Sequence, residues 1–106
     1  SAYDRSRYVT IEGTVKQFVW SNPHTRILLV AEGAGGAIKQ WDFEGGGVNR
    51  LSNGGFNRNT IVPGDKIKVA YNPMRDGSSG GFFLAVTAAD GKLYGAERLQ
   101  GFRGPN

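Results

Sequence analysis

Apolar and polar residues alternate along several short runs of this chain, which is the pattern of β-strands with one buried face. The longest run covers residues 8–20, and one of its faces carries Val9, Ile11, Gly13, Val15, Gln17 and Val19. Phe18 and Trp20 fall on the opposite face. This run is longer than an average strand of about 5–6 residues, and we expect it to bulge or bend at Gly13. A long, coiled first strand of this kind can serve both halves of a small barrel.

Further runs predict strands at residues 24–31, 37–43, 66–71 and 82–87, with a short extended piece at 92–94. Between the third and fourth strands the spacing of apolar residues changes to that of a short helix within residues 45–55, which Gly54 and Gly55 end. Strand-strand-strand-helix-strand-strand is the order of the oligonucleotide/oligosaccharide-binding (OB) fold. The sequence therefore predicts an all-β, five-stranded OB-fold-like barrel with a short helix between strands 3 and 4.

The length of 106 residues fits a single domain over residues 1–106. The 17 glycines are more than twice the usual share of about 7%. Because glycine weakens helix and strand interiors and supplies turns, this surplus favours a loop-rich β protein. Residues 1–7 and 95–106 are expected to be flexible ends.

The formal net charge of +4 permits nucleic acid or other anionic partners, but the basic residues are scattered and form no basic arm. The absence of cysteine excludes disulfides, thiolate zinc sites and cysteine nucleophiles. No stretch approaches the roughly 18 apolar residues of a membrane span. Composition therefore leaves binding functions open and removes thiol chemistry.

His24 is the only histidine, and no nucleophile-elbow motif accompanies it. We therefore expect no catalytic residue, no cofactor and no metal site from these residues, and expect His24 to bond backbone groups at its turn. Asp42 and Glu44 flank Phe43 and share one face of a strand. Two such carboxylates can serve acid–base work or bind a cation, or they can simply face solvent.

Aromatic residues along the strands allow two interpretations. In an OB-type barrel, the outer faces of the second and third strands stack bases or sugars, and Trp41 with Lys39 and Arg26 would suit that role. Alternatively, Trp41 and Phe43 fill a small core, since aromatic side chains dominate core burial. Both interpretations are consistent with the sequence.

Five motifs give the chain a family resemblance: V-T-I-E-G-T-V at 9–15, W-S-N-P-H at 20–24, W-D-F-E at 41–44, G-F-N-R at 55–58 and P-G-D at 63–65. The chain resembles a family of small exported bacterial domains of unknown function, over about residues 8–94. It departs from that family by Phe56, where Trp is usual, and by Gly45–Gly47, where a stronger helix start is usual. The resemblance implies the barrel fold and supplies no activity.

The resemblance also implies a location. Members of the family usually carry a secretory signal, and often a His-His pair just after the cleavage site, which would precede Ser1 here. We therefore expect a periplasmic or secreted protein whose signal peptide has been removed.

We expect a non-enzymatic extracytoplasmic module that binds a small ligand or a protein partner. The candidate ligand-binding face consists of motif residues near strand ends: Trp20, Asn22, His24, Arg26, Trp41, Glu44 and Arg58. One alternative is a single-stranded nucleic-acid-binding OB domain. The other is a periplasmic copper- or zinc-binding protein that combines His24 with histidines preceding Ser1.

Overall fold

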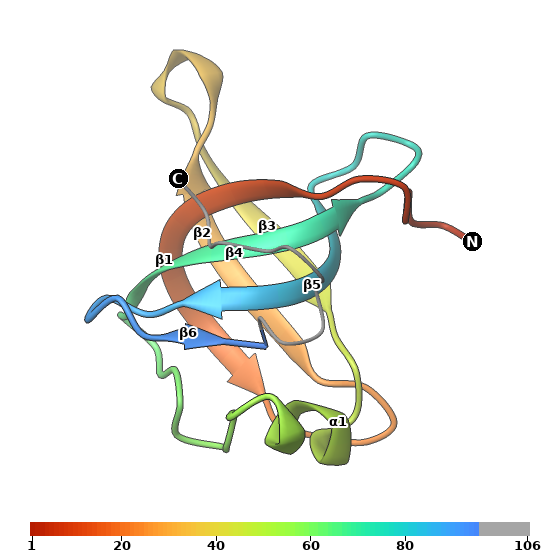
Figure 1. Cartoon of the computed structure of the whole chain (residues 1–106). Helices are drawn as coiled ribbons and strands as arrows, with labels where there is room; N and C mark the ends of the chain where they lie inside the picture. The colour runs from red at the N-terminus through yellow and green to blue at the C-terminus, as the bar shows by residue number, and fades with distance from the viewer. Residues whose placement is uncertain (96–106) are drawn as a thin grey trace.

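A computed structural model of the chain describes residues 1–95. The elements are β1 (Val9–Val19), β2 (Arg26–Glu32), β3 (Ile38–Glu44), α1 (Val48–Asn53), β4 (Lys66–Pro73), β5 (Gly80–Thr87) and β6 (Leu93–Tyr94). A single 3-10 turn at Ala34–Gly36 joins β2 to β3 in the predicted hairpin loop. Every predicted strand is present, and the helix lies between the third and fourth strands as predicted (Figure 1).

The strands close into a five-stranded barrel in the order β1-β2-β3-β5-β4, with β4 pairing back to β1. All pairs are antiparallel except β3 with β5, which is parallel and completes the barrel. The short β6 pairs with β5 as an additional strand outside the closed barrel. This arrangement confirms the predicted all-β barrel and its short helix.

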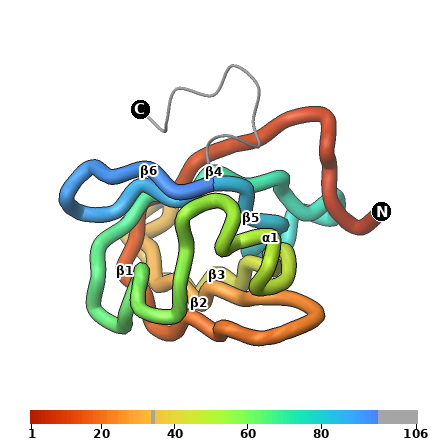
Figure 2. The backbone as a smooth tube through the Cα atoms, turned by 60° about the horizontal axis from the view of Figure 1, so that its bottom comes forward, coloured from red at the N-terminus to blue at the C-terminus, as the bar shows by residue number. Residues whose placement is uncertain are grey.

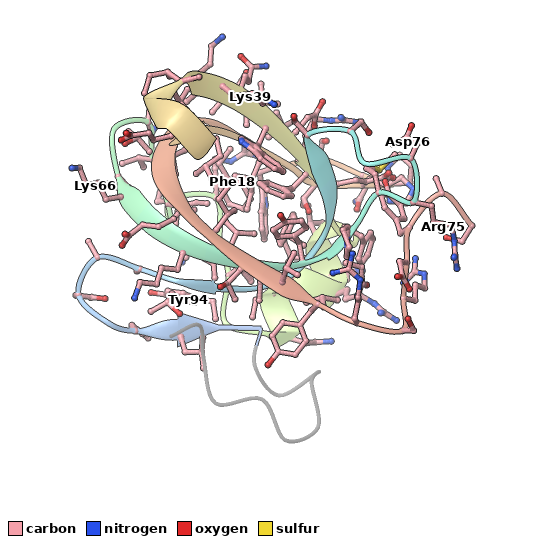
Figure 3. The ribbon with its side chains drawn as sticks, turned by 90° about the horizontal axis from the view of Figure 1, so that it is seen from above. Phe18, Lys39, Lys66, Arg75, Asp76 and Tyr94 are labelled. Atoms are coloured by element: carbon pink, nitrogen blue, oxygen red, sulfur yellow. The ribbon has the colours of Figure 1, made fainter. Side chains whose placement is uncertain are left out.

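The bulge in β1 lies at a different place from the one predicted. The register with β2 shifts between Val15 and Gln17, so Lys16 and not Gly13 is the extra residue. Beyond the shift the inward face changes from odd to even positions, and Phe18 comes opposite the fully buried Ile27. Figure 3 shows Phe18 pointing into the barrel. The alternation predicted for residues 8–20 is therefore interrupted at Lys16, and Gln17 and Val19 do not share the inward face of Val15.

Gly13 has a different role, because here β1 passes very close to β2. A Cβ atom at this position would lie 2.6 Å from the Val30 carbonyl oxygen and 2.9 Å from the Leu29 side chain. Gly13 also pairs with Ile67 of β4. Glycine is therefore required at the crossing where β1 passes from one half of the barrel to the other.

The core fills the barrel and is closed at one end by α1 and the segment after it. Its fully buried side chains include Ile27, Leu29, Phe43, Ile67, Val69 and Val86. Leu51 of α1, with Phe56 and Ile61 from the following segment, covers the open end of this core. Figure 2 shows α1 lying across that end, and Figure 1 shows the β2–β3 hairpin projecting from the opposite end.

Strands β4 and β5 are longer than predicted. Pro73 pairs with Gly81, while Gly80 pairs with Asp42 of β3. A Cβ on Gly80 would lie 2.2 Å from the Asp42 carbonyl oxygen, so only glycine allows the two strands this approach. The closure brings the start of β5 directly beside the end of β3.

Residues 1–7, predicted to be a flexible end, make backbone contacts with the barrel. Tyr3 forms a β-bridge with Met74, and the Asp4 amide donates to the Pro73 carbonyl at 2.8 Å. The Arg75 amide donates to the Ala2 carbonyl at 2.9 Å. Figure 3 shows Arg75 and Asp76 on the β4–β5 loop beside this segment. The predicted flexible tail at 95–106 lies, beyond Gly95, outside the described residues.

Candidate polar binding site

The candidate site lies where β2 begins and β3 ends, on the outer face of the barrel. Arg26 is the register partner of Glu44, and Leu28 is the partner of Asp42. Because side chains alternate along a strand, Asp42 and Glu44 face outward while Phe43 is buried. Asp42 and Glu44 therefore share the outer face of β3, as predicted, and both contact neighbouring polar groups there.

One ion pair and one histidine–carboxylate contact join these outward groups. The Arg26 Nη1 atom lies 2.6 Å from Asp42 Oδ1. The His24 Nδ1 atom lies 3.2 Å from Glu44 Oε2 and 3.2 Å from the Gly45 carbonyl oxygen, and both oxygens are acceptors for a proton on that nitrogen. His24 thus bonds backbone at its turn as predicted, and it also borders the carboxylate.

Tyr3 completes the cluster from the start of the chain. Its hydroxyl donates a hydrogen bond to Glu44 Oε1 at 2.5 Å, and its ring packs against Phe82 with centroids 5.7 Å apart. Burial, and after it the hydrogen bond to the Glu44 carboxylate, raise the pKa of Tyr3 to about 12. The hydrogen bond and charge of Asp42 raise the pKa of Arg26. Tyr3 is therefore a neutral donor, and Arg26 is cationic.

A hollow of about 220 Å³ lies over this cluster. It is lined by four side chains of the cluster, Tyr3, Arg26, Asp42 and Glu44. The rest of its lining comes from the β4–β5 region, namely Met74 and residues 78–81. Ser78 is already bonded to Asp76 within the loop. The hollow thus lies between those four polar side chains and the residues of the β4–β5 region. We call Tyr3, His24, Arg26, Asp42 and Glu44 the polar cluster.

Asn22, a predicted site residue, supports α1. Its Oδ1 accepts a hydrogen bond from the Val48 amide at 3.0 Å, which satisfies one of the amides at the start of that helix. A Cβ on Gly47 would lie 2.8 Å from the same oxygen. Asn22 therefore acts as a helix cap supplied from the β1–β2 loop.

The two tryptophans pack against the core and do not join the polar cluster. Trp41 stacks on Phe43 with centroids 6.2 Å apart and an interplanar angle of 13°. Its Nε1 is buried with no hydrogen-bond partner among the described residues. Trp20 packs edge-on against Phe18 at 5.7 Å. Of the two interpretations, the packing of Trp41 and Phe43 favours a core role.

Arg58 lies in a separate hollow, formed by the segment after α1 together with Lys92 and Tyr94. Of the seven predicted residues, the structure thus brings together His24, Arg26 and Glu44. The sequence analysis left Asp42 and Tyr3 out of the site. Asp42 carried a usable signal, its shared face with Glu44, whereas no local pattern marked Tyr3.

Within residues 1–95, no group of three or more His, Asp or Glu side chains is arranged to hold a metal ion. No helix in the same range has the length and apolar character needed to cross a membrane.

Comparison with curated proteins gave no match. A family model matches residues 1–84, a range that includes β1 to β4, the polar cluster and most of β5. On this match, the chain belongs to DUF6152, a family of unknown function.

Proposed function

We propose that this chain is a non-enzymatic binding module that works outside the cytoplasm and holds a small polar ligand in the hollow over the polar cluster. The observation that carries the proposal is the convergence of Tyr3, Arg26, Asp42 and Glu44 around that hollow, with His24 in contact with Glu44. These side chains come from three separate segments of the chain. Such convergent polar groups are typical of sites that orient a ligand.

The chemistry of the cluster favours a neutral ligand with several hydroxyl groups. Asp42 and Glu44 supply acceptor oxygens, while the guanidinium of Arg26 has five N–H donors, of which Nη1 contacts Asp42. A hydroxyl group both donates and accepts, so it can bond to either kind of partner. The hollow of about 220 Å³ is smaller than the roughly 300–1,000 Å³ of sites for drug-sized ligands. A monosaccharide-sized polyol therefore fits this proposal best.

A binding role is favoured over catalysis by the surroundings of His24. Among the described residues, its ring contacts the Glu44 carboxylate and the Gly45 carbonyl, and neither is a nucleophile that a base could activate. Of the alternatives, nucleic acid would have to approach two carboxylates on the β2–β3 face, and these repel phosphates. The copper or zinc alternative depends on histidines that would precede Ser1.

The location outside the cytoplasm is part of the proposal and rests on the sequence resemblance to exported bacterial domains. Fractionation of the native host cell tests it directly. Recovery of the protein from the periplasmic or secreted fraction is expected. Recovery from the cytoplasmic fraction would overturn this part of the proposal and leave the ligand site to be judged on its own test.

Native mass spectrometry of the protein isolated from its own cell envelope is the first test of the ligand. An added mass would identify a small molecule or a metal ion. Titration with neutral hexoses and pentoses, followed by backbone-amide NMR, then locates the site. We expect shifts at residues around the hollow, including Ser79 and Gly80.

Glu44→Gln tests the contribution of the cluster, and Glu12→Gln is the matched control. Glu12 is an exposed carboxylate on β1 and does not line the hollow. Loss of a charged hydrogen-bond acceptor is expected to weaken binding at least about tenfold, whereas Glu12→Gln leaves it unchanged. Equal affinities of the two variants would contradict the proposal. Salt-dependent oligonucleotide binding, with a log–log slope of about −0.7 per phosphate contacted, would favour the nucleic-acid alternative instead.

A further inference from the structure

A second cavity lies between α1 and the outer side of β5, separate from the hollow over the polar cluster. Its volume is about 130 Å³. Its walls are largely apolar and include Leu51, Phe56, Phe82, Phe83 and Leu84. Phe56 packs edge-on against Phe83 with centroids 6.1 Å apart, so part of the wall is a fixed aromatic surface. We call this space the α1–β5 cavity.

Two arginines, Arg5 and Arg50, line the same cavity, and among residues 1–95 no Asp or Glu does. Both residues are exposed. The Arg5 guanidinium lies over the Phe82 ring, 4.8 Å from its centroid, which holds the charge beside the apolar wall. The ion pairs found within residues 1–95 do not include Arg5. The cavity therefore combines an apolar interior with a cationic rim.

A glycine next to the cavity lets Arg50 approach closely. A Cβ on Gly46 would lie 2.7 Å from Cδ of Arg50, so any larger residue would displace the stem of this side chain. Gly46 itself lines the cavity. Gly46, within the weak helix start Gly45–Gly47, is thus required by the packing of Arg50 at the cavity rim.

We propose that the α1–β5 cavity binds a small monocarboxylate with an apolar body, such as an arylacetate or a short-chain fatty acid. Apolar cavities of about 150 Å³ accommodate a benzene ring, and this one is of similar size. Guanidinium groups recognise carboxylates through paired, charge-assisted hydrogen bonds. The apolar body lies against Phe82 and Phe83, and the carboxylate faces Arg5 and Arg50.

This inference does not rest on the proposed function, because the cavity and the hollow over the polar cluster are lined by different residues. They are nevertheless close neighbours, since Tyr3 of the polar cluster packs against Phe82. The test therefore includes Glu44→Gln, which is expected to leave carboxylate binding in the cavity unchanged.

Titration of the full chain with sodium phenylacetate, followed by backbone-amide NMR, tests the proposal. The comparison ligand is 2-phenylethanol, which has the same apolar body without the charge. Because 2-phenylethanol cannot form the charge-assisted hydrogen bonds of a carboxylate, phenylacetate is expected to bind at least about tenfold more tightly. Shifts are expected at Leu51, Phe56 and Leu84. Equal binding of the two compounds, or no shift at these residues, would overturn the proposal.

Arg5→Gln and Arg50→Gln are each expected to weaken phenylacetate binding about tenfold. Arg58→Gln removes the same charge from an exposed arginine outside the cavity and serves as the matched control. Leu84→Phe fills the cavity and is expected to abolish binding, while its unfolding transition shows that the barrel remains folded. Weakening by Arg58→Gln equal to that by Arg5→Gln, or full binding by folded Leu84→Phe, would show that phenylacetate binds elsewhere.

Discussion

The Tyr3 hydroxyl donates a hydrogen bond to Glu44 Oε1 at 2.5 Å and so fastens the start of the chain to the end of β3. The residues are 41 positions apart, and the bond lies at the edge of the hollow over the polar cluster. It joins the segment before β1 to the strand that closes the barrel against β5. This contact has consequences for both stability and pH dependence.

Tyr3→Phe is expected to lower the free energy of unfolding by about 1 kcal/mol at neutral pH, because the Glu44 acceptor loses its donor. The variant should also change the response to alkali. The pKa of Tyr3 is about 12 in the folded chain against 10.0 ordinarily, so the folded state retains a proton that the unfolded chain loses between these values. The corresponding stabilisation is complete below pH 10 and is lost as the pH rises through about 12. Urea unfolding across this window measures both effects.

The control for this prediction is Tyr71, whose ionisation also contributes to the loss of stability at alkaline pH. Burial also raises the pKa of Tyr71, so Tyr3→Phe should keep part of the alkaline loss of stability and not all of it. If the free energy of unfolding falls with pH as steeply in Tyr3→Phe as in the parent protein, the Tyr3 hydroxyl does not have the raised pKa that its contact with Glu44 implies.

Asn22→Ala is expected to destabilise the fold by about 1 kcal/mol, the usual cost of losing a helix cap. The reason is that the Val48 amide, at the start of α1, would lose the acceptor that Asn22 provides. Asn49→Ala is the matched control, since Asn49 is exposed in the same helix, and its stability should be equal or slightly higher. Chemical unfolding of the two variants side by side measures the difference. Equal stability would mean that water replaces the cap at no cost.

Much of the fold was predictable because its signals are local. Period-two alternation placed the strands, and Gly54 with Gly55 ended the helix where the structure ends it. The same alternation placed Asp42 and Glu44 on one face, which is the part of the polar cluster that the sequence could reveal. These features depend on residues that lie within a few positions of one another.

The errors concern features that depend on pairing between distant segments. The bulge at Lys16 exists only relative to the register of β2, and a run of alternating residues contains no mark of it. The anchoring of Tyr3 depends on its bridge to Met74, which directly follows β4. Phe18 and Trp20 pack against the core for the first of these reasons, because the bulge moves the even positions after Lys16 to the core face.

Gly13→Ala is expected to destabilise the protein by about 1–3 kcal/mol, the usual cost of overpacking. The added methyl group would lie 2.6 Å from the Val30 carbonyl oxygen, which belongs to a paired strand and cannot move freely. Gly33→Ala is the control. Its φ of −96° suits any residue, and its nearest neighbour would be 3.7 Å away. Thermal unfolding should therefore show a lower Tm only for Gly13→Ala, and equal Tm values would refute the close crossing.

Trp41→Ala separates a core role from a ligand-stacking role. Because Trp41 stacks on Phe43 and packs against the core, its truncation is expected to cost about 3 kcal/mol or more. Trp41→Phe should cost much less, because it keeps an aromatic ring and removes an indole N–H that is buried without a partner among the described residues. A stacking platform for a ligand would give a different result, in which Trp41→Ala remains as stable as the parent protein and loses affinity for the hexoses. Urea unfolding and hexose titration of both variants therefore decide whether the W-D-F-E motif belongs to the core or to the site.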